Sequence, residues 1–216
     1  MININTKEVN KNVKNSVLDP LLDSMGEESP ESNYPSHQYE EEPYFAEDLS
    51  SAIPADPGYL YHGEYLPVLE KGISKIIEIE GPIEYELIVK RVKTAHNFRK
   101  AGSSIRAIID QAIPRDVLKT KFGNRTFYWP KNSKPEAWNK ARRFRSDFIE
   151  TQRTVFEISP EEINAIRQII IRRSESKLYA SQQVKKITEF LGYKKCTKKA
   201  ITYILEAFQH IDGLNG

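Results

Sequence analysis

The chain has 216 residues, 39% of them hydrophobic, and a formal net charge of +2, which suits a globular protein and argues against a fibrous or membrane-spanning one. Its apolar runs, such as Ile169–Ile171, are far too short to cross a bilayer, and the polar N-terminus lacks the apolar stretch of a signal peptide, so we expect a cytoplasmic protein with no membrane partner. The single cysteine excludes an internal disulfide, and the four histidines do not stand at metal-ligand spacings. We therefore expect no structural metal and no cofactor.

The two parts of the chain differ sharply in charge. Residues 1–60 carry three lysines against twelve carboxylates, a net charge of −9, and the remainder carries +11. The stretch GEESPESNYPSHQYEEEP, Gly26–Pro43, has almost no aliphatic residue to bury, so residues 1–57 are expected to be a mostly disordered acidic tail. Such a tail could shield the basic remainder as a mimic of nucleic acid or act as a solvating extension, and we favour the extension.

Residues 58–131 predict one small module. Apolar residues recur at 3,4 spacing in three short runs, over about 69–80, 84–95 and 103–113, the pattern of helices with one buried face. Gly81-Pro82 ends the first run, Ser103 is expected to cap the third, and Pro114 stops it. Three short helices are thus expected in sequence.

A β-hairpin is expected next. Two β-prone runs, Val117–Phe122 and Arg125–Trp129, are joined by Gly123-Asn124, a two-residue turn that matches strand twist. Alternation predicts Lys119 and Lys121 on an outward face, with Leu118 and Phe122 toward the core. Three helices followed by a hairpin is the order of a winged helix, a form of helix-turn-helix.

The sequence FRKAGSSIRAIIDQAI, Phe98–Ile113, has an echo 95 positions later in YKKCTKKAITYILEAF, Tyr193–Phe208, which indicates an internal repeat. The second copy opens with Ser159 as N-cap and Glu162 three positions on, a capping box. We therefore predict a mostly α fold with a small β-hairpin, made of tandem winged-helix-like modules over 58–131 and 157–216. A basic connector over 132–156 supplies Trp138, Phe144 and Phe148 to pack on either module, and the second copy lacks room for a full wing.

Basic and polar residues gather where each module would present its helix-turn-helix edge. For any one pair of cations a solvated face is the simpler interpretation, but recurrence in both copies favours contact with phosphates. The candidate DNA-binding residues are Arg99, Lys100, Ser103, Ser104, Arg106, Lys119, Lys121, Arg125, Lys194, Lys195, Lys198 and Lys199.

Other residues have structural alternatives that we weigh against functional ones. Tyr128 and Trp129 could stack on bases but are expected to close the core beneath the wing, and for Tyr203 both roles stay open. Ser103 and Ser104 are expected to be helix caps rather than nucleophiles. Asp110 and Asp116 are expected to be a solvated pair. No paired carboxylates and no metal-ligand cluster stand out, so we do not expect an enzyme.

The stretches IIEIEGPIEYELIVKRVKTAHNFRKAGSSIRAIID, TFYW and FEISPEEINAIRQII, followed by VKKITEFLGYKKCTKKAI, resemble the C-terminal domain of unknown function of large bacterial superfamily I helicase-like proteins. The resemblance runs from about Tyr59 to the C-terminus. It implies an accessory module, here without the motor, because the chain has no Gly-x-x-x-x-Gly-Lys-[Ser/Thr] loop. The nuclease-like domain that often precedes this module is also absent.

The sequence therefore favours a non-catalytic accessory protein that binds nucleic acid, with duplex DNA as the expected partner through phosphate contacts. The alternative is a protein–protein docking module for a helicase or nuclease assembly, because winged helices also serve as docking domains. A hydrolase is a third and weaker interpretation.

Overall fold

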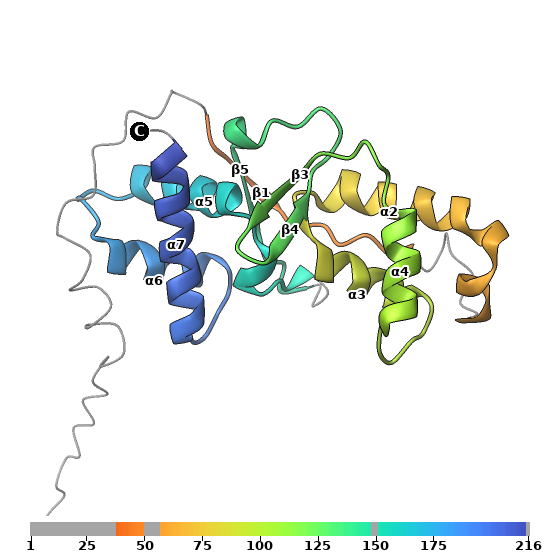
Figure 1. The fold of residues 1–216 in the computed structure, drawn as a ribbon. Coiled ribbons are helices and arrows are strands. Elements are labelled where there is room, and N and C mark those ends of the chain that lie inside the picture. The colour runs from red at the N-terminus through yellow and green to blue at the C-terminus, as the bar shows by residue number, and fades with distance from the viewer. Residues whose placement is uncertain (1–37, 50–56, 148–150, 215–216) are drawn as a thin grey trace, which may run out of the picture.

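The computed structural model describes residues 38–49, 57–147 and 151–214. The described chain is mostly helical, with two helical units on either side of two small central sheets (Figure 1). This agrees with the prediction of a mostly α protein with a little β structure. Phe148 and most of the predicted acidic tail, over 1–37 and 50–56, lie outside the described residues.

The first helical unit follows the predicted order of elements. Two 3₁₀ turns, η2 (Pro57–Tyr61) and η3 (Gly63–Tyr65), lead into α2 (Leu66–Glu80), α3 (Tyr85–Ala95) and α4 (Ser103–Ala112). The apolar positions that predicted these helices form one core, and fully buried members include Leu69, Ile73, Ile76, Ile88 and Ile109. All three predicted helices are confirmed.

The predicted hairpin is also confirmed, and a third strand joins it. Strands β3 (Lys119–Phe122) and β4 (Arg125–Tyr128) are antiparallel and joined at Gly123-Asn124, where Gly123 has the positive φ of 57° that favours glycine. The two-residue strand β2 (Ile83–Glu84) pairs antiparallel with β4, so the strand order is β2-β4-β3. We call the β3–β4 hairpin the wing.

The second helical unit consists of α5 (Pro160–Arg172), α6 (Ala180–Phe190) and α7 (Lys198–Leu214), preceded by the 3₁₀ turns η4 (Pro135–Ala137) and η6 (Val155–Glu157). Its core is separate from the first and is rich in isoleucine, with Ile158, Ile163, Ile166, Ile187 and Ile204 fully buried. Over the described residues 151–214 this unit has no hairpin of its own. Instead Phe122 of the wing packs edge-on against Tyr203 of α7, with ring centroids 5.2 Å apart.

The offset of 95 residues holds in the structure. Helices α3 and α6 are displaced by 95 residues at both ends, and α4 and α7 begin 95 residues apart. The turns between them also correspond, because Asn97 (φ 55°) and Gly192 (φ 75°) are both left-handed. In both copies the next residue's N–H reaches back to a carbonyl of the preceding helix, in Phe98 to Lys93 and in Tyr193 to Thr188.

Residues 38–49, which we call the N-terminal strap, are packed and ordered, so the expectation of disorder is wrong for this part of the tail. Its strand β1 (Glu40–Pro43) pairs in parallel with β5 (Lys140–Arg143) of the connector. The Glu41 carboxylate accepts bonds from Arg143 and Arg173, and Tyr44 and Leu49 are buried. Composition suggested disorder because it could not show that these carboxylates meet arginines from distant parts of the chain.

The two units meet at a cluster of buried charges that we call the central charge cluster: Glu80, Arg91, Arg142, Arg153 and Glu162. Arg142 donates to the carbonyl oxygens of Glu80 and Gly81 at the end of α2, at 2.6 and 2.9 Å. It also pairs with Glu162 of α5. One connector side chain therefore binds both helical units, and the strap covers it because the Tyr44 ring lies under Arg142 and Arg153.

Three local predictions are corrected. Ser103 is the first residue of α4 and Gly102 is the N-cap, without a side-chain cap bond. Ser159 does cap α5, but the Glu162 side chain binds Arg142 and Arg153 instead of closing a capping box. Leu118 precedes β3 and is 44% exposed, while Phe122 faces the second core rather than the first.

Candidate nucleic-acid interface

The predicted cations of the two interhelical turns are exposed and make no ion pair with any described residue. We call Arg99 and Lys100 the first basic turn. The second basic turn consists of Lys194, Lys195, Lys198 and Lys199. Long charged side chains without a carboxylate neighbour keep their full charge for an outside partner.

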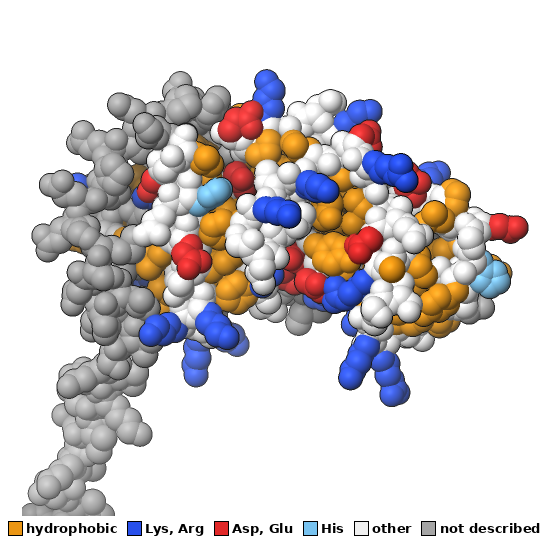
Figure 2. All heavy atoms as spheres, in the orientation of Figure 1, with side chains coloured by type: hydrophobic (Ala, Val, Ile, Leu, Met, Phe, Trp, Pro, Cys, Tyr) orange, Lys and Arg blue, Asp and Glu red, His pale blue; other side chains and the backbone are white. Residues whose placement is uncertain are grey.

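Both basic turns lie on one side of the molecule. Figure 1 shows the α3–α4 turn and the α6–α7 turn at the lower edge, on opposite sides of the centre. Figure 2 shows Lys and Arg side chains projecting from this edge in two groups. Because the central charge cluster joins the two units through buried contacts, the spacing between the turns is set by the fold.

Each basic turn also contains the N-terminus of a helix. The first N–H groups of a helix have no partner within it and form a partial positive charge. In α4 the cap is Gly102, which offers no side-chain acceptor, and in α7 the Thr197 hydroxyl accepts only from Ala200 N–H at 3.2 Å. Lys198 and Lys199 in the first turn of α7 add charge of the sign that the helix dipole disfavours. A bound anion would relieve this conflict.

The other predicted residues fall into two groups, those that are exposed and those that form ion pairs within the protein. Ser103 and Ser104 are exposed on α4, and Lys119 and Lys121 are exposed on the wing. Arg106 is engaged, because its guanidinium binds both oxygens of Glu86 at 2.7 and 2.8 Å and lies over the Tyr85 ring. This pairing lowers the pKa of the Glu86 carboxyl.

Arg125 of β4 is engaged as well. Its guanidinium lies 3.5 Å from the Glu84 carboxylate and 5.1 Å from the centre of the Phe156 ring. The predicted interface therefore contains ten cations. Eight are exposed on the two basic turns and the wing, while Arg106 and Arg125 pair with carboxylates of the protein itself.

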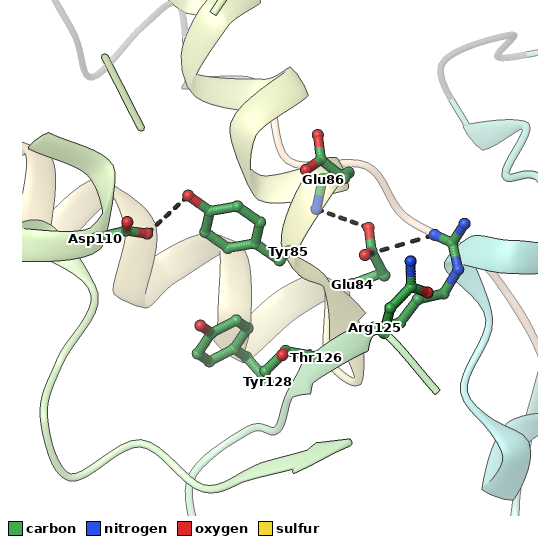
Figure 3. Close-up of a pocket in the computed structure, with 8 residues that line it drawn as sticks. Glu84, Tyr85, Glu86, Asp110, Arg125, Thr126 and Tyr128 are labelled. Carbon is green, nitrogen blue, oxygen red and sulfur yellow. Dashed lines mark hydrogen bonds and ion pairs between the residues drawn. The ribbon is translucent and has the colours of Figure 1, made fainter. Parts of the chain in front are cut away.

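An acidic pocket of about 390 Å³ separates α4 from the wing (Figure 3). Glu84 caps α3 by accepting from the N–H of Glu86 at 2.6 Å, and burial raises the pKa of Glu84. The Tyr85 hydroxyl donates to Asp110 at 2.7 Å, and Asp110 and Asp116 are both exposed, as the sequence suggested. Sequence reasoning missed this pocket because only the pairing of β2 with β4 brings Glu84 to the wing.

The aromatic residues of uncertain role lie mainly in the cores. Tyr128 and Trp129 are buried, as expected, and the indole N–H of Trp129 donates to the Thr120 hydroxyl at 3.0 Å. Tyr203 is buried and its hydroxyl donates to the carbonyl of Ile158 at 2.8 Å. These three residues therefore support the fold rather than a surface.

Within the described ranges, no group of three His, Cys, Asp or Glu side chains is placed to hold a metal ion. No helix in the same ranges combines the length and the apolar character that a membrane crossing requires. Neither finding points to a ligand. The candidate site therefore consists of the exposed cations of the two basic turns.

Residues 59–107 match the model of a family described as a protein of unknown function (DUF3320). The matched segment runs from η2 to the first half of α4 and includes the first basic turn. No curated protein and no solved structure matches the chain. The family match supports the predicted relation to a domain of unknown function, over 59–107, and names no activity.

Proposed function

We propose that the protein binds duplex DNA, without catalysis, through phosphate contacts made by its two basic turns. The observation that carries this proposal is the recurrence of exposed, unpaired cations at two turns that correspond at an offset of 95 residues and lie on one side of the molecule. Each turn combines these cations with a helix N-terminus, and both features attract phosphate.

The arrangement of the first unit supports a winged-helix-like module. A strand between its first two helices, β2, pairs with the hairpin that follows the third helix, and the hairpin faces α4 across the acidic pocket. In such modules the third helix and the wing present one surface to DNA. Here the acidic pocket interrupts that surface, so we assign the main phosphate contacts to the basic turns and an added contact to Lys119 and Lys121.

The contacts proposed are sequence-independent. Lysine is a flexible point charge, and lysines supply five of the six cations in the basic turns. Phosphate contacts fix position on a duplex without reading bases. The expected behaviour is moderate affinity that falls steeply with salt and varies little between sequences.

A second function, protein docking, is favoured by one observation, the acidic pocket itself. Its three carboxylates, Glu84, Glu86 and Asp110, outnumber the two arginines that pair with them, Arg125 and Arg106. The remaining negative charge beside two tyrosines suits a basic segment of a partner such as a helicase-type protein. Charge reversal at the basic turns would leave this docking intact, so the two functions respond to different variants.

The proposal is tested with the full chain and a fluorescently labelled duplex, measuring anisotropy across a salt series. Arg99→Glu with Lys100→Glu, and Lys194→Glu with Lys195→Glu, should each weaken binding and reduce the slope of log affinity against log salt by about two, since each phosphate contact contributes about 0.9. Lys131→Glu with Lys134→Glu is the matched control, because these exposed lysines lie outside both turns and the charge change is the same.

Two results would overturn the proposal. Turn variants that bind like the parent would remove the turns as phosphate contacts. Equal losses in the turn variants and in the control would show that binding follows net charge rather than this surface.

A further inference from the structure

Two exposed tyrosines and a half-buried phenylalanine stand together beside the first basic turn. Tyr61 is 56% exposed and its ring meets Phe98 edge-on, with centroids 6.3 Å apart. Tyr59 on the same 3₁₀ turn is 48% exposed. We call Tyr59, Tyr61 and Phe98 the aromatic patch. In Figure 2, hydrophobic surface gathers at the right-hand end of the molecule, where Figure 1 places η2 and the α3–α4 turn.

The patch has a rigid base. Phe98 stacks on the His96 ring at 6.0 Å with an angle of 20° between the planes, and His96 is buried. His96 is held by Tyr65 on one ring nitrogen, at 2.9 Å, and by the Val92 carbonyl on the other, at 2.8 Å. Leu60, between the two exposed tyrosines, is buried and anchors η2. The exposed rings are therefore presented in a fixed place at little entropic cost.

In the second copy of the repeat, the residues that correspond to Tyr61 and Phe98 pack within the protein. The residue that corresponds to Tyr61 at the offset of 95 is Phe156, which packs against the Tyr203 ring at 5.3 Å and lies under Arg125. Phe98 corresponds to Tyr193, whose hydroxyl donates to the carbonyl of Arg153. The position of Tyr61 is thus exposed in the first unit, while its counterpart Phe156 is half-buried in the second; Phe98 and Tyr193 are half-buried in both units.

The exposed Tyr61 ring and the free cations meet at the first turn. Tyr61 contacts Phe98, and Arg99 and Lys100 directly follow Phe98 and make no ion pair with a described residue. This combination is typical of surfaces that bind single-stranded nucleic acid, where cations hold phosphates and aromatic rings stack on bases. A paired base inside a duplex cannot offer its face to a side chain, whereas a base beyond the duplex end can.

We propose that the aromatic patch stacks an unpaired nucleobase, so that the preferred ligand is a duplex that carries a single-stranded end. The inference rests on the proposed function, with both basic turns holding duplex phosphates and the first turn lying at the end of the duplex, where pairing stops. Tyr61 is the principal stacking residue, since it is the more exposed of the two tyrosines and directly adjoins Phe98.

The test compares a blunt duplex with the same duplex carrying a short thymine overhang. Stacking on an aromatic side chain should tighten binding of the overhang ligand to the parent by at least about fivefold. Tyr61→Leu should abolish this gain and leave blunt-duplex affinity unchanged, and Tyr61→Phe should keep it. Tyr179→Leu is the matched control, because Tyr179 is 60% exposed on the second unit. A 2-aminopurine base in the overhang should lose fluorescence on binding to the parent and not to Tyr61→Leu.

The outcomes separate the two proposals. If the overhang adds no affinity while charge reversal at the basic turns still weakens blunt-duplex binding, base stacking is wrong and duplex binding stands. If Tyr61→Leu weakens both ligands equally, or if Tyr179→Leu also removes the gain, the patch is not a base-stacking site. If neither ligand binds, the proposed function itself fails.

Discussion

The guanidinium of Arg142 lies 2.5 Å from the carboxylate of Glu162, and both side chains are almost fully buried. Arg153 binds the same carboxylate at 2.7 Å. Burial alone would raise the pKa of Glu162, but the two guanidinium groups outweigh it and hold that pKa at about 2. The pair therefore joins the connector to α5 with full charges at neutral pH, while Arg142 also binds the end of α2.

Replacing Glu162 with Gln should strongly destabilise the fold, because two buried guanidinium groups would lose their carboxylate. Breaking a buried pair by removing one partner costs about 3–5 kcal/mol, and we expect a loss of this size in the free energy of unfolding at neutral pH. Urea denaturation followed by circular dichroism measures it.

The neighbouring residue gives a matched control. Glu161 is also buried in the first turn of α5, but its Oε2 atom has no hydrogen-bond partner and burial raises its pKa. Glu161→Gln should change stability by less than about 1 kcal/mol, since little favourable charge interaction is lost. Equal losses at the two positions would show that the charge pairing is not what stabilises this junction.

The strap should contribute measurably to stability. A chain that starts at residue 50 loses the β1–β5 pairing and the buried side chains of Tyr44 and Leu49. Each large apolar side chain contributes about 1.5–3 kcal/mol when buried, so the loss should be about 3–6 kcal/mol relative to a chain that starts at residue 38. Identical thermal midpoints for the two truncated chains would contradict a structural role for the strap.

His96 should make stability fall in mild acid. Burial lowers the pKa of its imidazole below the usual value, with the bond to the Val92 carbonyl acting weakly in the other direction. The unfolded chain therefore takes up a proton first as pH falls, so stability should drop below about pH 6.5, where an unperturbed histidine titrates. Unfolding free energies at about pH 7.5 and about pH 5.5 measure this drop.

The same measurement on two variants identifies the residue responsible. His96→Gln should be less stable than the parent but should lose less stability on acidification, whereas His62→Gln, at an exposed position, should follow the parent. A parent chain whose stability does not change between the two pH values would refute the role of His96.

The sequence predicted local structure far better than it predicted contacts between distant segments. The 3,4 spacing of Leu69, Ile73 and Ile76 located α2, and Gly123-Asn124 located the hairpin, since both signals are local. The strap was missed because its acidic composition acquires a role only when Glu41 meets Arg143 and Arg173, which lie 102 and 132 residues away. Likewise, the sequence placed Arg106 and Arg125 among the DNA-binding candidates, because it could not show that the fold pairs them with Glu86 and Glu84.

Lys119 and Lys121 of the wing provide the last prediction. Both are exposed, and in the described chain neither makes an ion pair, so changing both to Ala should shift thermal stability by no more than about 0.5 kcal/mol per site. If the wing touches the duplex, the double variant should bind DNA more weakly and lower the salt slope by about one to two.

The acidic pocket makes this outcome informative. It lies between α4 and the wing, and Lys119 and Lys121 pair with Tyr128 and Thr126, which line it, so phosphates at the wing lysines would lie near the carboxylates of the pocket. If the double variant binds like the parent with an unchanged salt slope, the duplex contacts only the basic turns. Docking of a basic partner at the pocket would then become the leading role of this face. Asp110→Asn with Glu86→Gln would test that role, because it should weaken binding of a lysine-rich peptide and leave duplex affinity unchanged or slightly higher.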